Sequence, residues 1–397
     1  MTKGVTTPLG FLVGAGEAGL RDHGGDDLVL LVAEEATASA AATLTTNRFR
    51  AAPVLLAEQA LAASGGQVKA VIVNAGCANA GTGPEGLQDA RSVVAAVAER
   101  LGCQPDEVIP ASTGLIGSRL KVEAIVAALG RIKLGRNGQR AAHAILTTDT
   151  VAKQAEAYVP TSHGRIVRLG GMAKGSGMIH PQMATMLAFV TTDAPVPADH
   201  LRSFLKAAVD ATFNQITVDG DTSTNDMVLA LASGAAGGEP ITPGTPDGDR
   251  FADALSELCR TLAVQIAADG EGAEHLIEVM VTGAASLADA RAAARTVASS
   301  SLLKAAVHGE DPNWGRIAAA AGRSGAELDP NRLRISIGPV VVFAGSPCPF
   351  DQVAARRQLK KRNVQLTLDL GIGEATAQAW GCDLTAEYVA INSEYPT

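Results

Sequence analysis

Residues 170–194 contain the side chains best suited to chemistry in this chain. The segment begins with glycines, carries Lys174 and ends in an apolar run over residues 186–190, with Ala184 and Thr185 just before that run. A threonine hydroxyl beside a small residue, after a Gly/Pro-rich loop, stands where it could attack its own backbone. By itself, an Ala-Thr pair in this position is more typical of a loop that leads into a buried strand.

A second group of candidate residues follows the short apolar run Val108-Ile109. Ser112, Thr113 and Gly114 place a hydroxyl and a flexible backbone at the end of a predicted strand. Hydroxyl and backbone N–H groups that face one point are what an oxyanion requires. Without other information, however, the motif indicates only a turn.

Two further polar stretches could contact a ligand. Residues 147–150 read Thr-Thr-Asp-Thr, and hydroxyls packed this densely usually cap an element or form a turn. Glu271 stands between two glycines, where packing gives no reason for a glutamate. A surface turn and a substrate contact fit Glu271 equally well.

Three other motifs are rejected. Residues 14–19 match the GxGxxG dinucleotide fingerprint, but no strand of sufficient length precedes them and no helix follows. Asp219 and Asp221 have the spacing of a calcium loop, yet its sixth position is not glycine and its twelfth is not glutamate. The five cysteines include no CxxC pair, which predicts reduced thiols, and Cys77 is best interpreted as an inert small hydrophobic residue. We therefore expect neither a metal nor a cofactor.

Composition limits the class of protein. The 397 residues can form one large or two ordinary domains, and with 47% hydrophobic but only 3% aromatic residues the core must be built from small aliphatic side chains. A net charge of −8 and a pI near 5.4 argue against nucleic acid or an anionic membrane as the main partner. No apolar run reaches the length of a bilayer span and the first ten residues lack a signal-peptide pattern, so we expect a cytoplasmic protein.

Hydrophobic periodicity predicts the elements that position these residues. Gly102 stands where a helix C-cap belongs. Residues 391–397 are too short and polar to form an element of their own. We expect strands over residues 28–32, 69–73, 166–169, 186–190, 277–281, 334–343 and 364–370, and helices over residues 86–101, 122–129, 141–146, 197–213, 251–268 and 287–306.

Several separated phrases together resemble the ornithine acetyltransferase family, the glutamate N-acetyltransferases of arginine biosynthesis. KGSGMIHPQMATMLAFVTTDA, residues 174–194, closely resembles the self-cleavage segment of that family, and EDPNWGR, residues 310–316, is a second specific phrase. The resemblance extends from the first fifty residues to the last six. One departure is clear: the family commonly has Thr-Lys where this chain has Glu274 and His275.

The resemblance implies a fold and self-cleavage of the chain. The implied fold is α/β (α+β), a layered sandwich of β-sheets covered by helices, with chemistry of the N-terminal-nucleophile type. It implies cleavage between Ala184 and Thr185, which gives chains of residues 1–184 and 185–397 that intertwine in a heterotetramer of two α and two β chains. Thr185 would then be the nucleophile, and Thr113 and Gly114 would form the oxyanion hole.

The resemblance also implies a reaction, in which Thr185 takes acetyl from N2-acetylornithine and passes it to glutamate, with acetyl-CoA as a possible additional donor. Two alternatives remain open: a self-cleaving aminopeptidase or amidase on the same scaffold, and an uncleaved, non-catalytic binding protein. For the threonine of residues 147–150, Thr147 is favoured over Thr148 and Thr150. The implied substrate contacts are Thr147, Lys174, Thr185, Glu271, Asn392 and Thr397.

Overall fold

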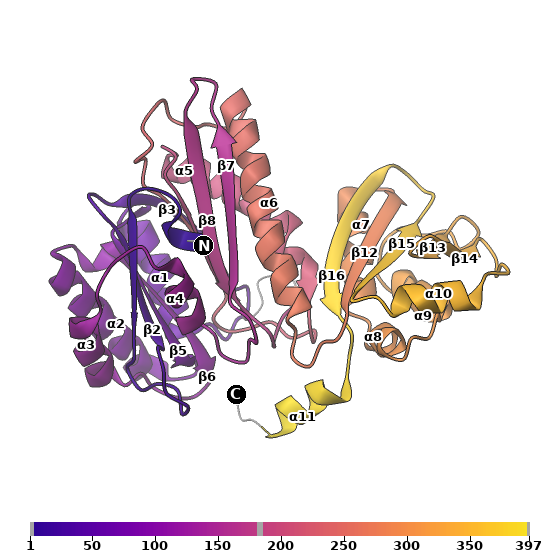
Figure 1. The fold of residues 1–397 in the computed structure, drawn as a ribbon, viewed down its shortest axis with the longest axis horizontal. Helices are drawn as coiled ribbons and strands as arrows, with labels where there is room; N and C mark the ends of the chain where they lie inside the picture. Colours follow the sequence, from indigo (N-terminus) through magenta and orange to yellow (C-terminus); the bar gives the residue numbers. More distant parts are fainter. Residues whose placement is uncertain (1–3, 181–185, 395–397) are drawn as a thin grey trace.

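A computed structural model describes residues 4–180 and 186–394 of the chain. Figure 1 shows two lobes, with two β-sheets in the first lobe and one in the second. The final helix, α11 (Ala386–Glu394), leaves the second lobe and runs beneath the gap between the lobes.

A four-stranded sheet forms one layer of the first lobe. Its order is β1 (Phe11–Gly16), β2 (Leu28–Ala33), β5 (Ala70–Cys77) and β6 (Val108–Leu115), and β5 and β6 run parallel. Helices α2 (Gly83–Leu101) and α3 (Val122–Arg131) pack on its outer face through valine, leucine, isoleucine and alanine side chains. The predicted C-cap is confirmed, since Gly102 has the left-handed φ of 64° that ends α2.

A six-stranded sheet faces the first across a shared apolar core. Two helices, α5 (Ala198–Ala211) and α6 (Pro246–Ala268), cover its other face, so this lobe is a sandwich of two sheets between helices. The predicted layered α/β sandwich is therefore confirmed. The strand order is β4 (Gln67–Val68), β3 (Ala38–Leu44), β11 (Met227–Ala232), β9 (Leu187–Thr192), β8 (Ile166–Lys174) and β7 (Lys153–Pro160).

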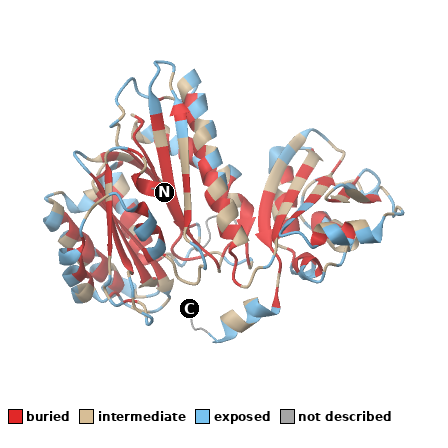
Figure 2. Ribbon diagram, in the orientation of Figure 1, coloured by how far each residue is buried: buried red, intermediate tan, exposed pale blue. Residues whose placement is uncertain are grey.

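The sandwich is completed by shorter elements. Helices α1 (Ala52–Ala63) and α4 (Gly138–Ala144) pack at the borders of the shared core. Three short 3₁₀ helices cover Gly4–Thr6, Pro105–Glu107 and Phe213–Gln215. Figure 2 shows the buried residues concentrated along the strands of both sheets.

The second lobe is a six-stranded sheet with helices and its own core. Its strands lie in the order β10 (Ile216–Thr217), β16 (Ala375–Cys382), β12 (Leu276–Ala284), β15 (Asn363–Asp369), β13 (Arg334–Ile337) and β14 (Val340–Ala344). The accompanying helices are α7 (Leu287–Ala298), α8 (Ser301–His308), α9 (Trp314–Gly322) and α10 (Gln352–Leu359).

Several predicted elements differ from the structure. The strand expected over residues 334–343 is divided into the antiparallel strands β13 and β14. The single helix expected over residues 287–306 is divided into α7 and α8, because the Ser300 side chain accepts from Leu303 N and starts a new helix. The carboxy-terminal residues expected to form no element belong in part to α11. Strand β6 does not end before Thr113 but continues to Leu115, because it pairs with β5 along its whole length. No helix within residues 4–180 or 186–394 has the length and apolar character that a membrane span requires.

Candidate functional site

A cavity of about 620 Å³ lies where the ends of β5, β6 and β8 meet the turn before β12 and the helix α11. Residues from both lobes line it. Ala184, Thr185 and Thr397 lie outside the described residues. The cavity brings together the other candidate residues of the sequence: Thr113, Gly114, Thr147, Lys174, Glu271 and Asn392.

Thr113 and Gly114 are held in place by the pairing of β6 with β5. Thr113 is 1% exposed, and Gly114 lies opposite Gly76 of the neighbouring strand with a φ of 125°. A Cβ on Gly114 would lie 2.3 Å from the Gly76 carbonyl carbon and 2.6 Å from the Cys77 nitrogen. Only glycine fits this backbone, which keeps the strand end close to the cavity.

The glycines beside Lys174 are typical of a flexible loop, but Lys174 lies in a strand. It is the last residue of β8, where it pairs with Leu187, and only 3% of its side chain is exposed. Its Nζ donates to Thr147 Oγ1 at 2.6 Å and to Thr113 Oγ1 at 3.3 Å. The ammonium group thus connects the predicted oxyanion residue with the predicted substrate threonine.

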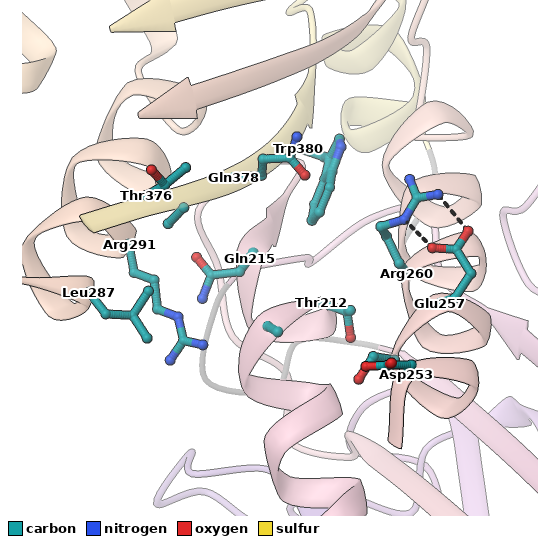
Figure 3. A pocket seen from close by; sticks show the side chains of 13 residues that line it. Thr212, Gln215, Asp253, Glu257, Arg260, Leu287, Arg291, Thr376, Gln378 and Trp380 are labelled. Carbon is teal, nitrogen blue, oxygen red and sulfur yellow. Dashed lines mark hydrogen bonds and ion pairs between the residues drawn. The ribbon is translucent and has the colours of Figure 1, made fainter. Parts of the chain in front are cut away.

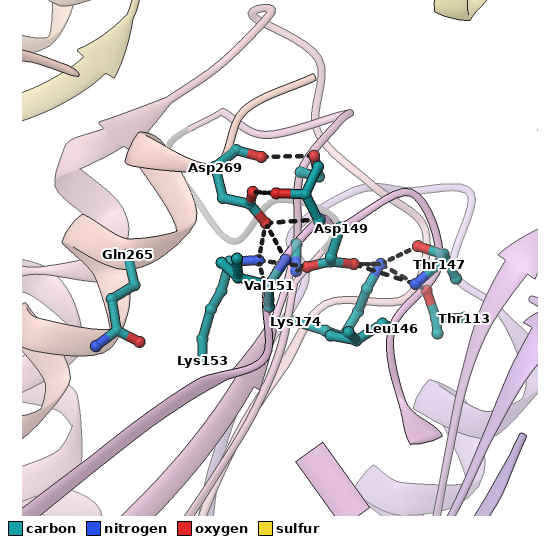
Figure 4. Close-up of polar contacts among 12 residues, drawn as sticks. Thr113, Leu146, Thr147, Asp149, Val151, Lys153, Lys174, Gln265 and Asp269 are labelled. Carbon is teal, nitrogen blue, oxygen red and sulfur yellow. Dashed lines mark hydrogen bonds and ion pairs between the residues drawn. The ribbon is translucent and has the colours of Figure 1, made fainter. Parts of the chain in front are cut away.

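The ammonium group of Lys174 belongs to a buried network of ion pairs (Figure 4). Asp149 lies 3.7 Å from Lys174 Nζ and 2.7 Å from Lys153 Nζ, and its Oδ1 also accepts from Gly175 N at 2.6 Å. Lys153, which is fully buried, makes a second ion pair with Asp269 at 2.5 Å. Each buried charge in this group therefore has an opposite charge beside it.

The network determines the ionisation of its members. Burial opposes ionisation of Asp149, but the charges of Lys174 and Lys153 outweigh it and lower its pKa to about 2. Burial lowers the pKa of Lys174, while the neighbouring carboxylate of Asp149 opposes that shift. The site therefore holds an ionised carboxylate beside a lysine whose proton is easier to remove than usual.

Glu271 and Asn392 meet across the cavity. Glu271 is 7% exposed, its backbone N–H donates to Ser176 O at 3.0 Å, and its Oε2 accepts from Asn392 Nδ2 at 2.8 Å. A Cβ on Gly177 would lie 2.5 Å from the Glu271 carboxylate, so that glycine leaves room for the acid. Of the two interpretations of Glu271, the surface turn is wrong, because the side chain lines a cavity.

The structure separates the candidate threonines of residues 147–150. Thr147 and Thr148 line the cavity, whereas Thr150 does not and instead donates to Asp269 Oδ1. Thr147 alone among them contacts Lys174. Cys77 also lines the cavity, but burial raises the pKa of its thiol, which donates to Ser118 O.

The sequence analysis missed several polar residues beside the cavity. Asp149, Lys153 and Asp269 were not proposed, although the first stands in the threonine cluster and the last begins the Asp-Gly-Glu-Gly turn. Asp226 was also missed: it is fully buried, it accepts from Met186 N at 2.9 Å, and burial raises its pKa well above the ordinary value. The only available signal was the polar Asn225-Asp226 pair before an apolar strand.

The segment with the rejected calcium-loop spacing instead holds the backbone that follows Lys174. Asp219 accepts from the backbone N–H groups of Met178 and Ile179, at 2.5 and 2.9 Å, and so holds the chain that follows Lys174. Both its carboxylate oxygens are used for these bonds.

A second cavity, of about 320 Å³, lies between α6, α7 and β16 (Figure 3). The Arg260–Glu257 ion pair, 2.6 Å long, lies on one wall, and Trp380 and Arg291 lie on others. None of the candidate residues from the sequence lines this cavity.

Comparisons with known proteins show the family of this chain. The profile of the ArgJ family matches residues 12–397. The "Arginine biosynthesis bifunctional protein ArgJ" of Symbiobacterium thermophilum is 50% identical, over 100% of this chain and 99% of the relative, and that of Geobacillus stearothermophilus is 47% identical, over 99% and 96%. A crystal structure of the arginine biosynthesis bifunctional protein argJ from Bacillus halodurans is 49% identical, with a TM-score of 0.51 over 52% of this chain and 98% of that one. This chain therefore belongs to the ArgJ family.

Proposed function

We propose that this chain is an ornithine acetyltransferase of arginine biosynthesis. It moves the acetyl group of N2-acetylornithine to glutamate and gives ornithine and N-acetylglutamate. The observation that carries the proposal is that one cavity gathers Thr113, Thr147, Lys174, Glu271 and Asn392 from five distant segments. Family membership supports the same conclusion.

Self-cleavage comes first in this proposal. The Thr185 hydroxyl attacks the carbonyl carbon of Ala184, the peptide C–N bond breaks, and the freed Thr185 amine takes up a proton. Water then hydrolyses the ester. Because the Thr113 hydroxyl oxygen accepts from Lys174 Nζ, its own hydrogen remains to stabilise the oxyanion, together with the backbone at Gly114.

The new amine makes acetyl transfer possible. The pKa of an α-amino group is about 8, so a substantial fraction of the Thr185 amine is neutral at cellular pH. The neutral amine can accept the proton of the Thr185 hydroxyl. The hydroxyl oxygen takes the acetyl group, the amide bond of acetylornithine breaks, and the ornithine amine leaves with that proton. The glutamate amine then attacks the acetyl carbon of the acetyl-threonine ester. The bond between that carbon and the Thr185 oxygen breaks, and the proton lost by the glutamate amine returns to the Thr185 oxygen.

The charges of the cavity suit amino-acid substrates. These substrates carry a cationic amine and an anionic carboxylate. We assign the amine to the buried Glu271 carboxylate and the carboxylate to Lys174, with Thr147 and Asn392 as hydrogen-bonding partners. Thr397 is proposed as a further contact.

We also propose that residues 1–184 and 185–397 form a heterotetramer of two chains of each kind, in the cytoplasm. The relatives are named as bifunctional, which supports acetyl-CoA as a further acetyl donor to glutamate.

The test is to incubate purified protein with N-acetylornithine, with and without glutamate, and to follow products and intact masses. We expect ornithine and N-acetylglutamate to form together, and without glutamate one acetyl group, about 42 Da, to add to the 185–397 fragment. Thr185→Ala should remain a single chain and transfer nothing. Free acetate at full rate without glutamate would mean an amidase, and an uncut, inactive wild type would mean a binding protein.

A further inference from the structure

A cluster of two histidines and two carboxylates lies in the second lobe, outside the cavity described above. It consists of Glu274, His275, His308 and Asp383. Glu274 and His275 stand just before β12, His308 ends α8, and Asp383 follows β16. We propose that this cluster is a binding site for a divalent transition metal such as Zn²⁺.

The donor set suits that metal. Imidazole nitrogen and carboxylate oxygen are ordinary Zn²⁺ ligands, with metal–ligand bonds of about 2.0–2.2 Å. In a tetrahedral shell such bonds place neighbouring ligand atoms about 3.3–3.6 Å apart. Here His275 Nδ1 lies 3.0 Å and His308 Nδ1 3.3 Å from Asp383 Oδ2, and His308 Nδ1 lies 3.7 Å from Glu274 Oε2.

Three of the four donor residues already have their ligand atoms close together. The ligand atoms of Glu274, His275 and Asp383 all lie within 4.8 Å of one another. A small turn of the Glu274 side chain, which is 64% exposed, would let a single ion contact the three. We assign His308 as the fourth ligand, because its Nδ1 lies near the oxygens of Asp383 and Glu274 and its side chain is 38% exposed, so that its ring can turn toward the ion.

The two carboxylates of the cluster are not neutralised by any lysine or arginine side chain that the structure describes. Among the described residues, no lysine or arginine makes an ion pair with Glu274 or Asp383. The nearby Lys304 faces Val218 O and Cys382 Sγ instead. Two close carboxylates repel each other, and a divalent cation would remove that repulsion. The carboxyl end of α8, where His308 lies, also favours positive charge.

Asp383 is oriented before any ion arrives. Its side chain is fully buried, and its Oδ1 accepts from the backbone N–H groups of Glu274 and His275, both at 2.9 Å. Its Oδ2 is therefore directed at the two imidazoles. A second set of bonds that fixes a ligand in this way is characteristic of metal sites.

The ion would join two parts of the proposed active site. Glu274 and His275 follow directly on the turn that carries Glu271, and Asp383 precedes Thr385, whose hydroxyl donates to Gly272 O at 2.8 Å. Helix α11, with Asn392, begins three residues after Asp383. Metal binding would thus hold the Glu271 turn and the start of α11 together.

The alternative is that both imidazoles only donate hydrogen bonds to Asp383. The test uses the full-length, tag-free protein after treatment with a chelator and its removal. Zn²⁺ is titrated by calorimetry, and Co²⁺ is followed by its visible absorption, which is strong only in tetrahedral sites. We expect about one ion per chain and a higher thermal midpoint with Zn²⁺ than with the chelator.

Variants decide between the two. His275→Lys puts an ammonium group beside Asp383, and His308→Gln changes an exposed ring, so both should fold. Each should weaken Zn²⁺ binding by at least about tenfold and abolish the cobalt absorption. His143→Gln, on the exposed face of α4 with its Nδ1 beside Gln139 O, is the matched control and should bind as the wild type does. Equal Zn²⁺ affinity in the wild type and His275→Lys, or no binding by the wild type, would overturn the proposal.

Discussion

At the residue scale, Gly114 provides the sharpest test of the proposed oxyanion hole. Gly114→Ala should slow self-cleavage and acetyl transfer by about a hundredfold or more, because the new Cβ pushes the strand end away from Gly76 and misplaces a donor. The measurements are the fraction of cut chain against time on a denaturing gel and the initial transfer rate.

Gly117→Ala is the matched control for this prediction. Gly117 also has a positive φ, 86°, but nothing lies within 4 Å of its added Cβ. The Gly117→Ala variant should have the same backbone strain as Gly114→Ala, but its new Cβ should not displace the strand end. We therefore expect it to remain active. Equal cleavage rates for Gly114→Ala and the wild type would remove Gly114 from the site.

Asn392 allows binding to be separated from self-cleavage. Asn392→Ala removes the hydrogen bond to Glu271 Oε2 and should lower kcat/KM for acetylornithine by about tenfold or more. Cleavage should be unchanged, since it needs only Thr185 and its oxyanion donors. Ser393→Ala, whose hydroxyl bonds within α11, is the control. A slower cut in Asn392→Ala would contradict this division of roles.

At the element scale, the loop between α4 and β7 depends on Asp149. Asp149→Asn leaves Lys153 and Lys174 without their shared carboxylate, and the loss of one partner from buried ion pairs costs about 3–5 kcal/mol. We expect the urea midpoint at neutral pH to fall accordingly. Asp199→Asn, which breaks an ion pair of an 87% exposed carboxylate, should change the midpoint little.

The same substitution predicts a pH dependence. The pKa of Asp149 is about 2 in the folded chain, below its ordinary value of 3.8. Its contribution to the free energy of unfolding is therefore complete above pH 3.8 and is lost as the pH falls toward 2. The difference in urea midpoint between wild type and Asp149→Asn should be constant from neutral pH to about 4 and shrink below it. A difference that grows on acidification would contradict the assignment.

At the scale of the whole molecule, the sheet topology determines what a cut would do. In the order β4-β3-β11-β9-β8-β7, the central strands β11 and β9 follow the proposed cleavage site, and the four flanking strands precede it. Strands of one fragment therefore pair with strands of the other: β11 pairs with β3, and β9 pairs with β8. The Lys153–Asp269 ion pair also joins the two fragments.

We accordingly expect the two fragments to stay together after cleavage. They should co-elute in native size-exclusion chromatography and separate only under denaturing conditions, and residues 185–397 expressed alone should not fold. Native separation of residues 1–184 from residues 185–397 would show that the sheet is not shared as described.

The sequence alone predicted the elements whose patterns are local. The apolar spacing of α2, α5 and α6 and the glycine after α2 are properties of neighbouring residues, so these helices could be expected within a few positions. The candidate residues were identified from short phrases, each local in sequence, that resemble the ornithine acetyltransferase family. Their identification needed no knowledge of distances.

Only the tertiary structure decided the surroundings of these residues. Lys174 follows a glycine-rich run that indicates a loop, yet the pairing of β8 with β7 and β9 makes it a buried strand end. The sequence did not identify Lys153 and Asp269, because their ion pair joins residues that are 116 positions apart in the chain. Asp149 stands near Lys153 in sequence, but only the fold brings Lys174 to its carboxylate. Burial and long-range pairing depend on how distant segments pack, and no pattern within a few neighbouring residues contains that information.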